Sequence, residues 1–341
     1  MPDRFRPAAV HDLDALPAEL RGGVVAIGNF DGLHRGHAEL VRLTVAGARR
    51  RGVPALLLTF EPHPRSVFRP EAPVFRLTSL AAKARAAGAL GVDAVVVAPF
   101  DRAFSEMDAD AFTAAVLVGR LAAAEVVIGR DFRFGKGRTG SAATLAGEGE
   151  RHGFAVTVAD VVLSGEGEPV SSSAIREALS AGDIARANEL LGHRWFVVGT
   201  VVPGDRRGRE LGFPTANVRL DGDCRLRHGI YAVTVTVDGR TFDAVASYGR
   251  RPTFDNGAPL LESYLFDFSG DLYGREVIVT FFAWIRPEER FASVADLVAA
   301  MNRDAAEARA ILAAAGRGSA DDAALAASQK GAAVVRTDGM G

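Results

Sequence analysis

In the first half of the chain, short uninterrupted apolar runs alternate with segments whose apolar residues recur at helical spacing. Such runs are typical of strands buried on both faces, and the intervening segments are typical of helices that cover them. We therefore predict an α/β domain whose doubly wound parallel sheet binds ligands beyond the carboxyl ends of its strands. The expected strands lie within residues 23–30, 54–60, 93–100, 124–129 and 154–162, and the expected helices within 37–52, 77–91 and 108–121.

From Trp195 onward the pattern changes to residue-by-residue alternation, and Asp238-Gly239 is a strong hairpin turn. Short alternating strands separated by turns predict a small antiparallel β-barrel. Residues 294–315 predict a closing amphipathic helix, whereas residues 316–341 lose periodicity and predict a disordered tail. The expected domains are residues 1–184, 185–315 and the tail 316–341.

Charge and cysteine content narrow the class of protein. Lys and Arg number 40 against 42 Asp and Glu, a formal net charge of −2, which disfavours nucleic acid as the main partner. The single cysteine, Cys224, excludes an internal disulfide framework and fits a reducing compartment. The N-terminal stretch has no signal-peptide pattern, and Arg120 and Glu125 interrupt the most apolar segment. We expect a soluble cytoplasmic protein without nucleic-acid or membrane partners, and weak self-association is left open.

The segment GNFDGLHRGHAEL, residues 28–40, follows the first expected strand and opens the first expected helix. Backbone N–H groups at a helix start attract an anion, and Gly32 and Gly36 let the backbone approach it. His34 and His37 can then donate hydrogen bonds to phosphoryl oxygens as charge builds up in a transition state. Two alternatives stay open: a hydrolytic metal site, and histidines that only cap the helix.

A second cluster, PVSSSAIREAL at residues 169–179, places three serines before an apolar-periodic run. One of them is expected to be the N-cap of a helix whose first turn carries Arg176. A plain capped helix accounts for the serines alone. Three hydroxyls and an arginine at a helix start also make a phosphate site.

A third cluster, GRDFRFGKGRTGS at residues 129–141, has four basic residues among four glycines directly after the fourth expected strand. A solvated flexible loop is the simple interpretation. The position at the same sheet edge favours a binding loop.

In the second half, GDRRGRELGFPTANV at residues 204–218 is a basic, glycine-rich loop without the Walker spacing. Its glycines and arginines can wrap phosphates. Thr215 and Asn217 are alternate residues of an extended segment, so their oxygens converge, and hard oxygen ligands beside nucleotide phosphates suit Mg²⁺. The alternative is that the two side chains only satisfy the backbone of a turn.

Glu262 lies in the expected strand at residues 260–268. A carboxylate in an apolar row is costly unless paired, and burial would raise its pKa toward that of a usable general base. Pairing with Arg250 or Arg251 is the structural alternative. The residues on the same face are Leu260, Tyr264, Phe266 and Phe268.

The motifs of the first half are GNFDGLHRGH, TFEPHPRSVF, GRDFRFGKGRTG and SSSAIR. In order and spacing they resemble the nucleotidyltransferase module of bacterial bifunctional riboflavin kinase/FAD synthetases. The second half resembles the riboflavin kinase module of this family through GRELGFPTAN, GIYAV, GRRPTF, LESYLFDFSGDLYG and RPEERF. The resemblance covers about residues 20–312. It implies a Rossmann-like FMN adenylyltransferase domain followed by a six-stranded riboflavin kinase barrel.

The resemblance implies that the first domain adenylylates FMN with ATP to give FAD and pyrophosphate. His34 and His37 would stabilise the α-phosphate of ATP, Ser172 and Arg176 would hold the ATP phosphates, and no covalent enzyme intermediate is implied. The further ATP contacts expected are Gly28, Phe30, Asp31, Gly32, Gly36 and Ser173, and the expected flavin and phosphate loop consists of Arg130, Asp131, Phe132, Arg133 and Lys136.

The barrel would phosphorylate riboflavin with ATP to give FMN. Glu262 would act as base on the ribityl 5′-hydroxyl, and Thr215 and Asn217 would bind Mg–ATP. The further ATP contacts expected in this domain are Gly204, Arg207, Gly208, Gly212 and Pro214.

Two other classes of function stay open. One is an enzyme with a single activity, in which the other module only binds flavin or nucleotide. The other is a non-catalytic, flavin-responsive regulator. A regulator should lack the base or the phosphate loop, and this chain has both Glu262 and the loop at residues 204–217.

Overall fold

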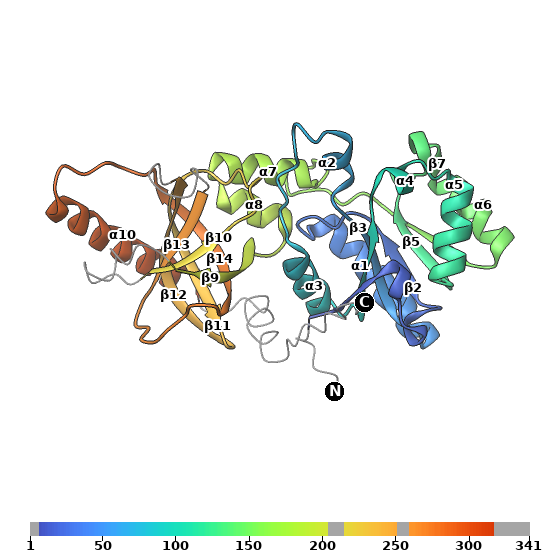
Figure 1. Cartoon of the computed structure of the whole chain (residues 1–341), viewed down its shortest axis with the longest axis horizontal. Helices are drawn as coiled ribbons and strands as arrows, with labels where there is room; N and C mark the ends of the chain where they lie inside the picture. The colour runs from blue at the N-terminus through green and yellow to red at the C-terminus, as the bar shows by residue number, and fades with distance from the viewer. Residues whose placement is uncertain (1–6, 204–214, 251–258, 317–341) are drawn as a thin grey trace, which may run out of the picture. The chain divides into compact units, whose positions relative to one another are not determined.

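The computed structural model describes residues 7–203, 215–250 and 259–316. This part of the chain divides into two compact units, each with its own sheet (Figure 1). The first unit contains residues 7–74 and 83–170. The second contains residues 75–82 and the described residues from 171 onward.

The first unit is built on a six-stranded sheet of order β1-β4-β3-β2-β5-β8, in which every neighbouring pair is parallel. The prediction of a parallel α/β sheet is confirmed. The five predicted strands are present, and β1 is an additional, mostly exposed edge strand without an apolar run. The strands are β1 (Ala9–Asp12), β2 (Val24–Ile27), β3 (Ala55–Glu61), β4 (Ala94–Pro99), β5 (Glu125–Gly129) and β8 (Ala155–Ala159).

Helices connect these strands. The first helix ends at Gly52, whose φ of 69° is the left-handed conformation typical of a glycine that terminates a helix. The helices are α1 (Arg35–Arg51), α2 (Pro64–Phe68), α3 (Leu80–Ala89), α4 (Arg102–Ser105), α5 (Ala109–Phe112), the π-helix η3 (Thr113–Arg120) and α6 (Ala142–His152). Short elements are η1 (Leu13–Ala15), η2 (Ala18–Leu20), η4 (Lys136–Arg138), β6 (Arg133–Phe134) and β7 (Gly140–Ser141).

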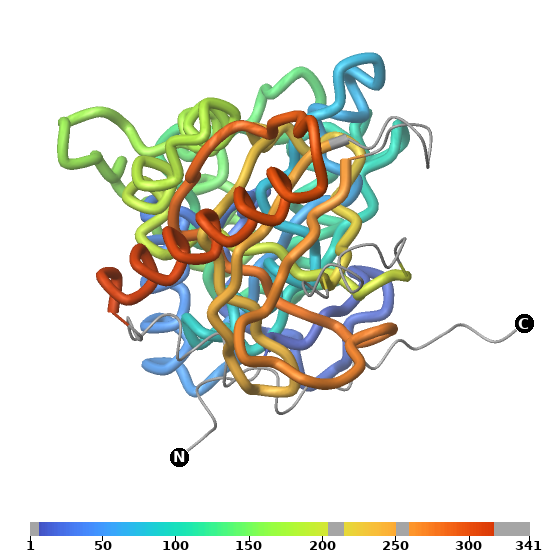
Figure 2. Tube along the Cα trace, turned by 90° about the vertical axis from the view of Figure 1, so that its left-hand side faces the viewer, coloured from blue at the N-terminus to red at the C-terminus, as the bar shows by residue number. Residues whose placement is uncertain are grey.

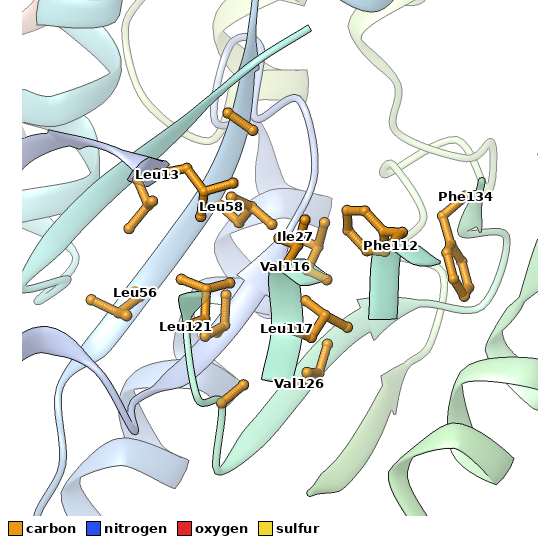
Figure 3. Packing of buried hydrophobic residues seen from close by; sticks show 14 of the residues in the cluster. Leu13, Ile27, Leu56, Leu58, Phe112, Val116, Leu117, Leu121, Val126 and Phe134 are labelled. Atoms are coloured by element: carbon orange, nitrogen blue, oxygen red, sulfur yellow. The ribbon is translucent and has the colours of Figure 1, made fainter. Parts of the chain in front are cut away.

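The core on one face of this sheet lies between the central strands and the segment formed by α5 and η3 (Figure 3). Side chains of β2, β3 and β5 point toward those of the helical segment. Because the central strands are mostly apolar on both faces, both sheet faces must be covered, and this packing covers one of them. The residues labelled in the figure are Leu13, Ile27, Leu56, Leu58, Phe112, Val116, Leu117, Leu121, Val126 and Phe134.

The second unit contains a closed antiparallel barrel of order β10-β13-β12-β11-β14-β9, which confirms the predicted six-stranded barrel. The hairpin turn between β11 and β12 is at Asp238 and Gly239, whose φ angles of 49° and 74° match a two-residue turn. The elements are α7 (Ser172–Ala181), α8 (Ile184–Leu191), β9 (Phe196–Val202), β10 (Thr215–Arg219), β11 (Gly229–Val237), β12 (Arg240–Arg250), β13 (Pro259–Leu265), β14 (Glu276–Arg286) and α10 (Val294–Ala315).

The barrel has a filled interior and one outer face covered by α10, which lies across the strands in Figure 2. Ala308 and Leu312 of α10 pack on Ala232 and Phe266. Arg286 donates two hydrogen bonds of 2.7 Å to the carboxylate of Asp304, and these join the end of β14 to α10. The interior is filled by residues such as Tyr231, Val233, Val235, Leu261 and Phe281, each at most 1% exposed.

The domain boundaries proposed from sequence stay predictions. The compact units separate between Val170 and Ser171, so that α7 and α8 belong to the second unit. The predicted tail lies outside the described residues from 317 onward.

Candidate functional site

The loop between β2 and α1 has a constrained backbone. Phe30, Gly32 and Leu33 have φ angles of 47°, 85° and 45°. Glycine adopts this region freely, whereas the other two residues do so at a cost of about 1–3 kcal/mol each. The side chains of Phe30 and Leu33 are 0% and 1% exposed, and their packing holds the turn in place. Asp31 in the same loop is also buried.

The loop ends at His34, which is the N-cap of α1. Its Nδ1 accepts a hydrogen bond from the backbone N–H of His37 over 3.4 Å, a long distance for such a bond. A side chain at Gly36 would come within 3.2 Å of the His34 ring, so glycine permits this approach. His34 therefore caps the helix, as the capping alternative expects. Capping does not account for the side chain of His37.

The rings of His34 and His37 stack, with centroids 3.7 Å apart and planes 18° apart. Phe30 contacts His37 on the same side of the loop, with ring centroids 5.3 Å apart. Among the described residues, the buried Nδ1 of His37 has no hydrogen-bond partner. Desolvation by burial, the neighbouring His34 and the charge of Lys83 hold the pKa of His37 well below its usual value. His37 is therefore a neutral imidazole at physiological pH.

Stacking also bears on the metal alternative. Nearly parallel rings do not direct their nitrogen lone pairs toward one shared ion. Within the described ranges, no group of three or more His, Cys, Asp or Glu side chains is placed to hold a metal ion.

A buried lysine of the first unit was missed by sequence reasoning. Lys83 in α3 donates from its Nζ to Thr59 Oγ1 over 2.8 Å and lies 3.7 Å from Glu61 Oε1. The available signal was a lysine within the alanine-rich segment LAAKARAAGA.

The basic loop after β5 is largely exposed. Arg130 pairs with Asp160, and Lys136 pairs with Glu106 over 2.6 Å, which raises the pKa of Lys136. Arg133 begins the short strand β6, and Asp131 is exposed. Hydrogen-bonded ion pairs at an exposed surface contribute little stability, so these side chains can exchange their partners for a ligand at small cost.

Phenylalanine rings form a continuous chain of contacts that reaches this loop. Neighbouring centroids are 5.5–6.1 Å apart, and Phe132 and Phe134 stack with planes 17° apart. Phe68, at one end of the chain, is 65% exposed. Exposed and half-exposed aromatic faces are suited to a flat ligand. The rings are Phe60, Phe68, Phe100, Phe104, Phe112, Phe132 and Phe134.

At the start of α7, Ser171 is the N-cap and accepts a hydrogen bond from the N–H of Ala174 over 3.3 Å. Ser172 and Ser173 are the first two helical residues, so their hydroxyls are not needed for the cap. Arg176 donates from Nε to the carbonyl of Phe75 over 2.6 Å, a contact within the second unit. The combination of these groups with His34 and His37 in one ATP site stays a prediction.

In the barrel, Glu262 of β13 lies opposite Asn217 of β10 and opposite Ser247 of β12. Asn217 is 4% exposed, and its Oδ1 has no hydrogen-bond partner in the described part of the chain. Thr215 lies one pair further along, opposite Tyr264. The strand register thus places Thr215, Asn217 and Glu262 on one face of the sheet, and their roles in Mg–ATP binding and catalysis stay predictions.

The surroundings of Glu262 differ from the expectation. Leu261, Ser263 and Leu265 form the buried row of β13, whereas Leu260, Glu262 and Tyr264 are half-buried. Tyr264 packs near α10, which places this row on the outer face of the barrel. Glu262 is thus half-buried rather than buried. The side chains of Arg250 and Arg251, and the predicted contacts Gly204, Arg207, Gly208, Gly212 and Pro214, lie outside what the structure describes.

A second carboxylate lies beside Glu262 and was not predicted. Glu288 hydrogen-bonds with Ser247, and its carboxylate fills the space that a side chain at position 249 would need. Burial is the main cause of its raised pKa, and the negative charge of Glu262 adds to it, while His228 acts in the opposite direction.

Comparisons with known proteins give two family matches in one order along the chain. The family model for FAD synthetase matches residues 16–174, and the model for riboflavin kinase matches residues 191–312.

No helix of the described residues is both long and apolar enough to cross a membrane.

Relatives match over most of both chains. The bifunctional riboflavin kinase/FMN adenylyltransferase of Pseudomonas fluorescens is 41% identical over 89% of this chain and 97% of its own length. The proteins of the same name from Escherichia coli K12 and Bacillus subtilis are 40% and 33% identical, over 95% of their lengths. A solved structure named as a macrolide-efflux protein from Streptococcus pneumoniae has a TM-score of 0.77 and 30% identity, and covers 88% of this chain and 99% of its own.

Proposed function

The chain belongs to the family of bifunctional riboflavin kinase/FMN adenylyltransferases, and we propose that its two reactions occur at the two sites described above. It phosphorylates riboflavin with ATP to FMN, and it adenylylates FMN with a second ATP to FAD and pyrophosphate. The observation that carries this conclusion is the presence of both family matches, in order, on one chain.

We assign the adenylylation step to the loop at residues 28–37. A phosphate oxygen of FMN attacks the α-phosphorus of ATP, and the bond from that phosphorus to the pyrophosphate oxygen breaks. The start of α1 and the imidazoles of His34 and His37 stabilise the charge that develops on the α-phosphate oxygens. A neutral His37 supports this role, because a neutral imidazole donates one N–H without repelling the nearby Lys83.

The exposed and half-exposed rings of the phenylalanine chain are our candidate for the flavin site of the same reaction, whereas Phe112 and Phe134 belong to the buried core. An isoalloxazine ring is flat and aromatic, and stacked or edge-on contacts to phenylalanine rings bind such a group. Phe132 and Phe134 connect these rings to the basic loop, where Arg130, Arg133 and Lys136 are suited to the FMN phosphate. Ser172, Ser173 and Arg176 are assigned to the ATP phosphates on the strength of the helix start that they occupy.

In the kinase reaction, Glu262 takes the proton from the ribityl 5′-hydroxyl, whose oxygen attacks the γ-phosphorus of ATP while ADP leaves. Half-burial suits this role, because the carboxylate can still be reached by a substrate. The negative charge of Glu262 contributes to the raised pKa of the neighbouring Glu288, after burial.

Thr215 and Asn217 are the residues that would hold Mg²⁺. The buried, unpartnered Oδ1 of Asn217 fits a hard cation, since within the described chain no protein group satisfies it. When bound, Mg²⁺ would neutralise charge on the ATP phosphates.

Product analysis tests the proposal. The full chain is incubated with riboflavin, ATP and MgCl₂, and the flavins are separated by chromatography, with a chelator control. FMN followed by FAD is expected. FMN alone, or FAD only from supplied FMN, would select an enzyme with one activity, and no product would select a flavin-binding regulator.

A cytoplasmic location is part of the proposal and is supported by the single cysteine.

A further inference from the structure

Lys83 is a buried cation next to the adenylylation loop. Its side chain is only 4% exposed, although it lies in an otherwise alanine-rich helix. Burying an ammonium group is costly unless hydrogen bonds and an opposite charge compensate. Glu61 supplies a partial counter-charge at 3.7 Å and is 20% exposed. The shorter contact, 2.8 Å, is to the hydroxyl of Thr59.

The contact to Thr59 leads to the loop. An ammonium group can only donate, so the Thr59 oxygen accepts from Lys83 and its own proton is free for another acceptor. That acceptor is the carbonyl of Asn29, 3.1 Å from Thr59 Oγ1. Consecutive hydrogen bonds of the same direction polarise and strengthen one another. Lys83 is thus linked through one side chain to the backbone that precedes the strained turn at Phe30.

Lys83 also acts on His37 through space. Its positive charge is one of the causes that lower the pKa of His37, after burial and the neighbouring His34. The charged groups that act on His37 are therefore His34, the N-cap of α1, and Lys83 of α3. Lys83 is thus linked to the loop backbone through Thr59 and acts on His37 through its charge.

We propose that Lys83 is a positioning residue of FMN adenylylation: through Thr59 it holds the Asn29–Phe30 turn that leads into His34 and His37. This inference rests on the proposed function. It assigns Lys83 no direct contact with substrate. The opposing interpretation is that Lys83 only compensates Glu61 and stabilises the fold.

The experiment measures both activities of the full chain in three variants. Lys83→Met removes the charge and the donor, and Thr59→Val removes the hydroxyl with little change in volume. Arg85→Met is the matched control, because Arg85 is a buried cation two positions along the same helix and therefore on another face. Kinase activity in each variant reports on the barrel unit, and circular dichroism with thermal unfolding reports on the folding of the unit that contains the substitutions.

We expect Lys83→Met to lower kcat for FAD formation by about tenfold or more, with a smaller change in the KM for FMN and unchanged FMN formation. Thr59→Val should lower the same kcat, and the double variant should be no worse than Lys83→Met, because the two residues act through one link. An NMR titration of Lys83→Met should give a higher His37 pKa. Arg85→Met should keep both rates.

Two results would overturn the inference. One is FAD formation by Lys83→Met within about twofold of the unmodified chain; the other is additive losses in the double variant. If Lys83→Met fails to fold, Thr59→Val decides, and a normal rate in that variant rejects the link. Absence of FAD formation by the unmodified chain would instead reject the proposed function.

Discussion

The imidazole rings of His34 and His37 stack with centroids 3.7 Å apart at the first turn of α1. At this distance two positive charges would repel strongly, and burial adds to the penalty. The lowered pKa of His37 therefore keeps this ring neutral, and a neutral imidazole still has one N–H to donate to an anion.

Replacing His37 with alanine should lower FAD formation by about a hundredfold or more, because a preorganised donor to the developing charge is lost. FMN formation should be unchanged, since the kinase site lies in the other unit. Chromatography of both products from one incubation checks this. Loss of both activities in a protein that still unfolds cooperatively would contradict the assignment of separate sites.

FAD formation should keep its rate as the pH falls to below about 6.5, the ordinary value for histidine, because the pKa of His37 is depressed. Stability should change in the same window. Below about pH 6.5 the unfolded chain binds a proton at His37 that the folded chain does not, so the free energy of unfolding falls. A pH–rate profile and an NMR titration measure these effects. An acid limb above pH 6.5 that His37→Gln removes would contradict the prediction.

Glu262→Gln should remove kinase turnover by about a hundredfold or more while riboflavin still binds, because the amide cannot take a proton. Flavin fluorescence measures binding, and ATP-dependent FMN formation measures turnover. Ser263→Ala is the matched control: Ser263 is the next residue of β13, lies in the buried row, and its hydroxyl has no partner in the described chain. That variant should keep its kinase rate. A normal rate in Glu262→Gln would return Glu262 to a structural role.

Asn217→Leu should abolish kinase activity without lowering the melting temperature. The Oδ1 of Asn217 is buried without a protein partner in the described residues, so its removal costs no hydrogen bond. Thermal unfolding and the dependence of the rate on MgCl₂ concentration test the two halves of this statement. A destabilised protein, or one with unchanged Mg²⁺ dependence, would show that Asn217 has a structural role instead.

Deleting residues 317–341 should leave both activities within about twofold, because α10 already ends at Ala315 and is capped by Gly316, whose N–H donates to the carbonyl of Ala313. Both rates and the melting temperature of the shortened chain provide the check. A large loss of either rate would assign this segment a role in that reaction.

The fold was largely predictable from local patterns. Uninterrupted runs such as Val24–Ile27 identify strands buried on both faces, and the alternation from Trp195 onward identifies a barrel. The edge strand β1 was missed because only four residues form it and most of them are exposed. Proximity was predictable where residues are close in sequence, as for His34 and His37, whose rings stack.

Which face of β13 is buried could not be predicted from its pattern. Both rows of the strand contain large apolar residues, because one faces the barrel interior and the other meets α10. An outer helix thus makes the two faces look alike in sequence. Glu262 was accordingly expected to be buried, and it is half-buried.

The sequence by itself determined the two architectures, the turn residues and the residue types that each reaction needs, because periodicity and turn chemistry are local properties. Tertiary structure alone decided which distant residues act together. Register places Asn217 opposite Glu262, and helix packing brings Lys83 against Thr59, 24 residues away in the chain. Such pairings depend on how whole elements pack, because the local sequence around one residue does not identify the residue that it contacts.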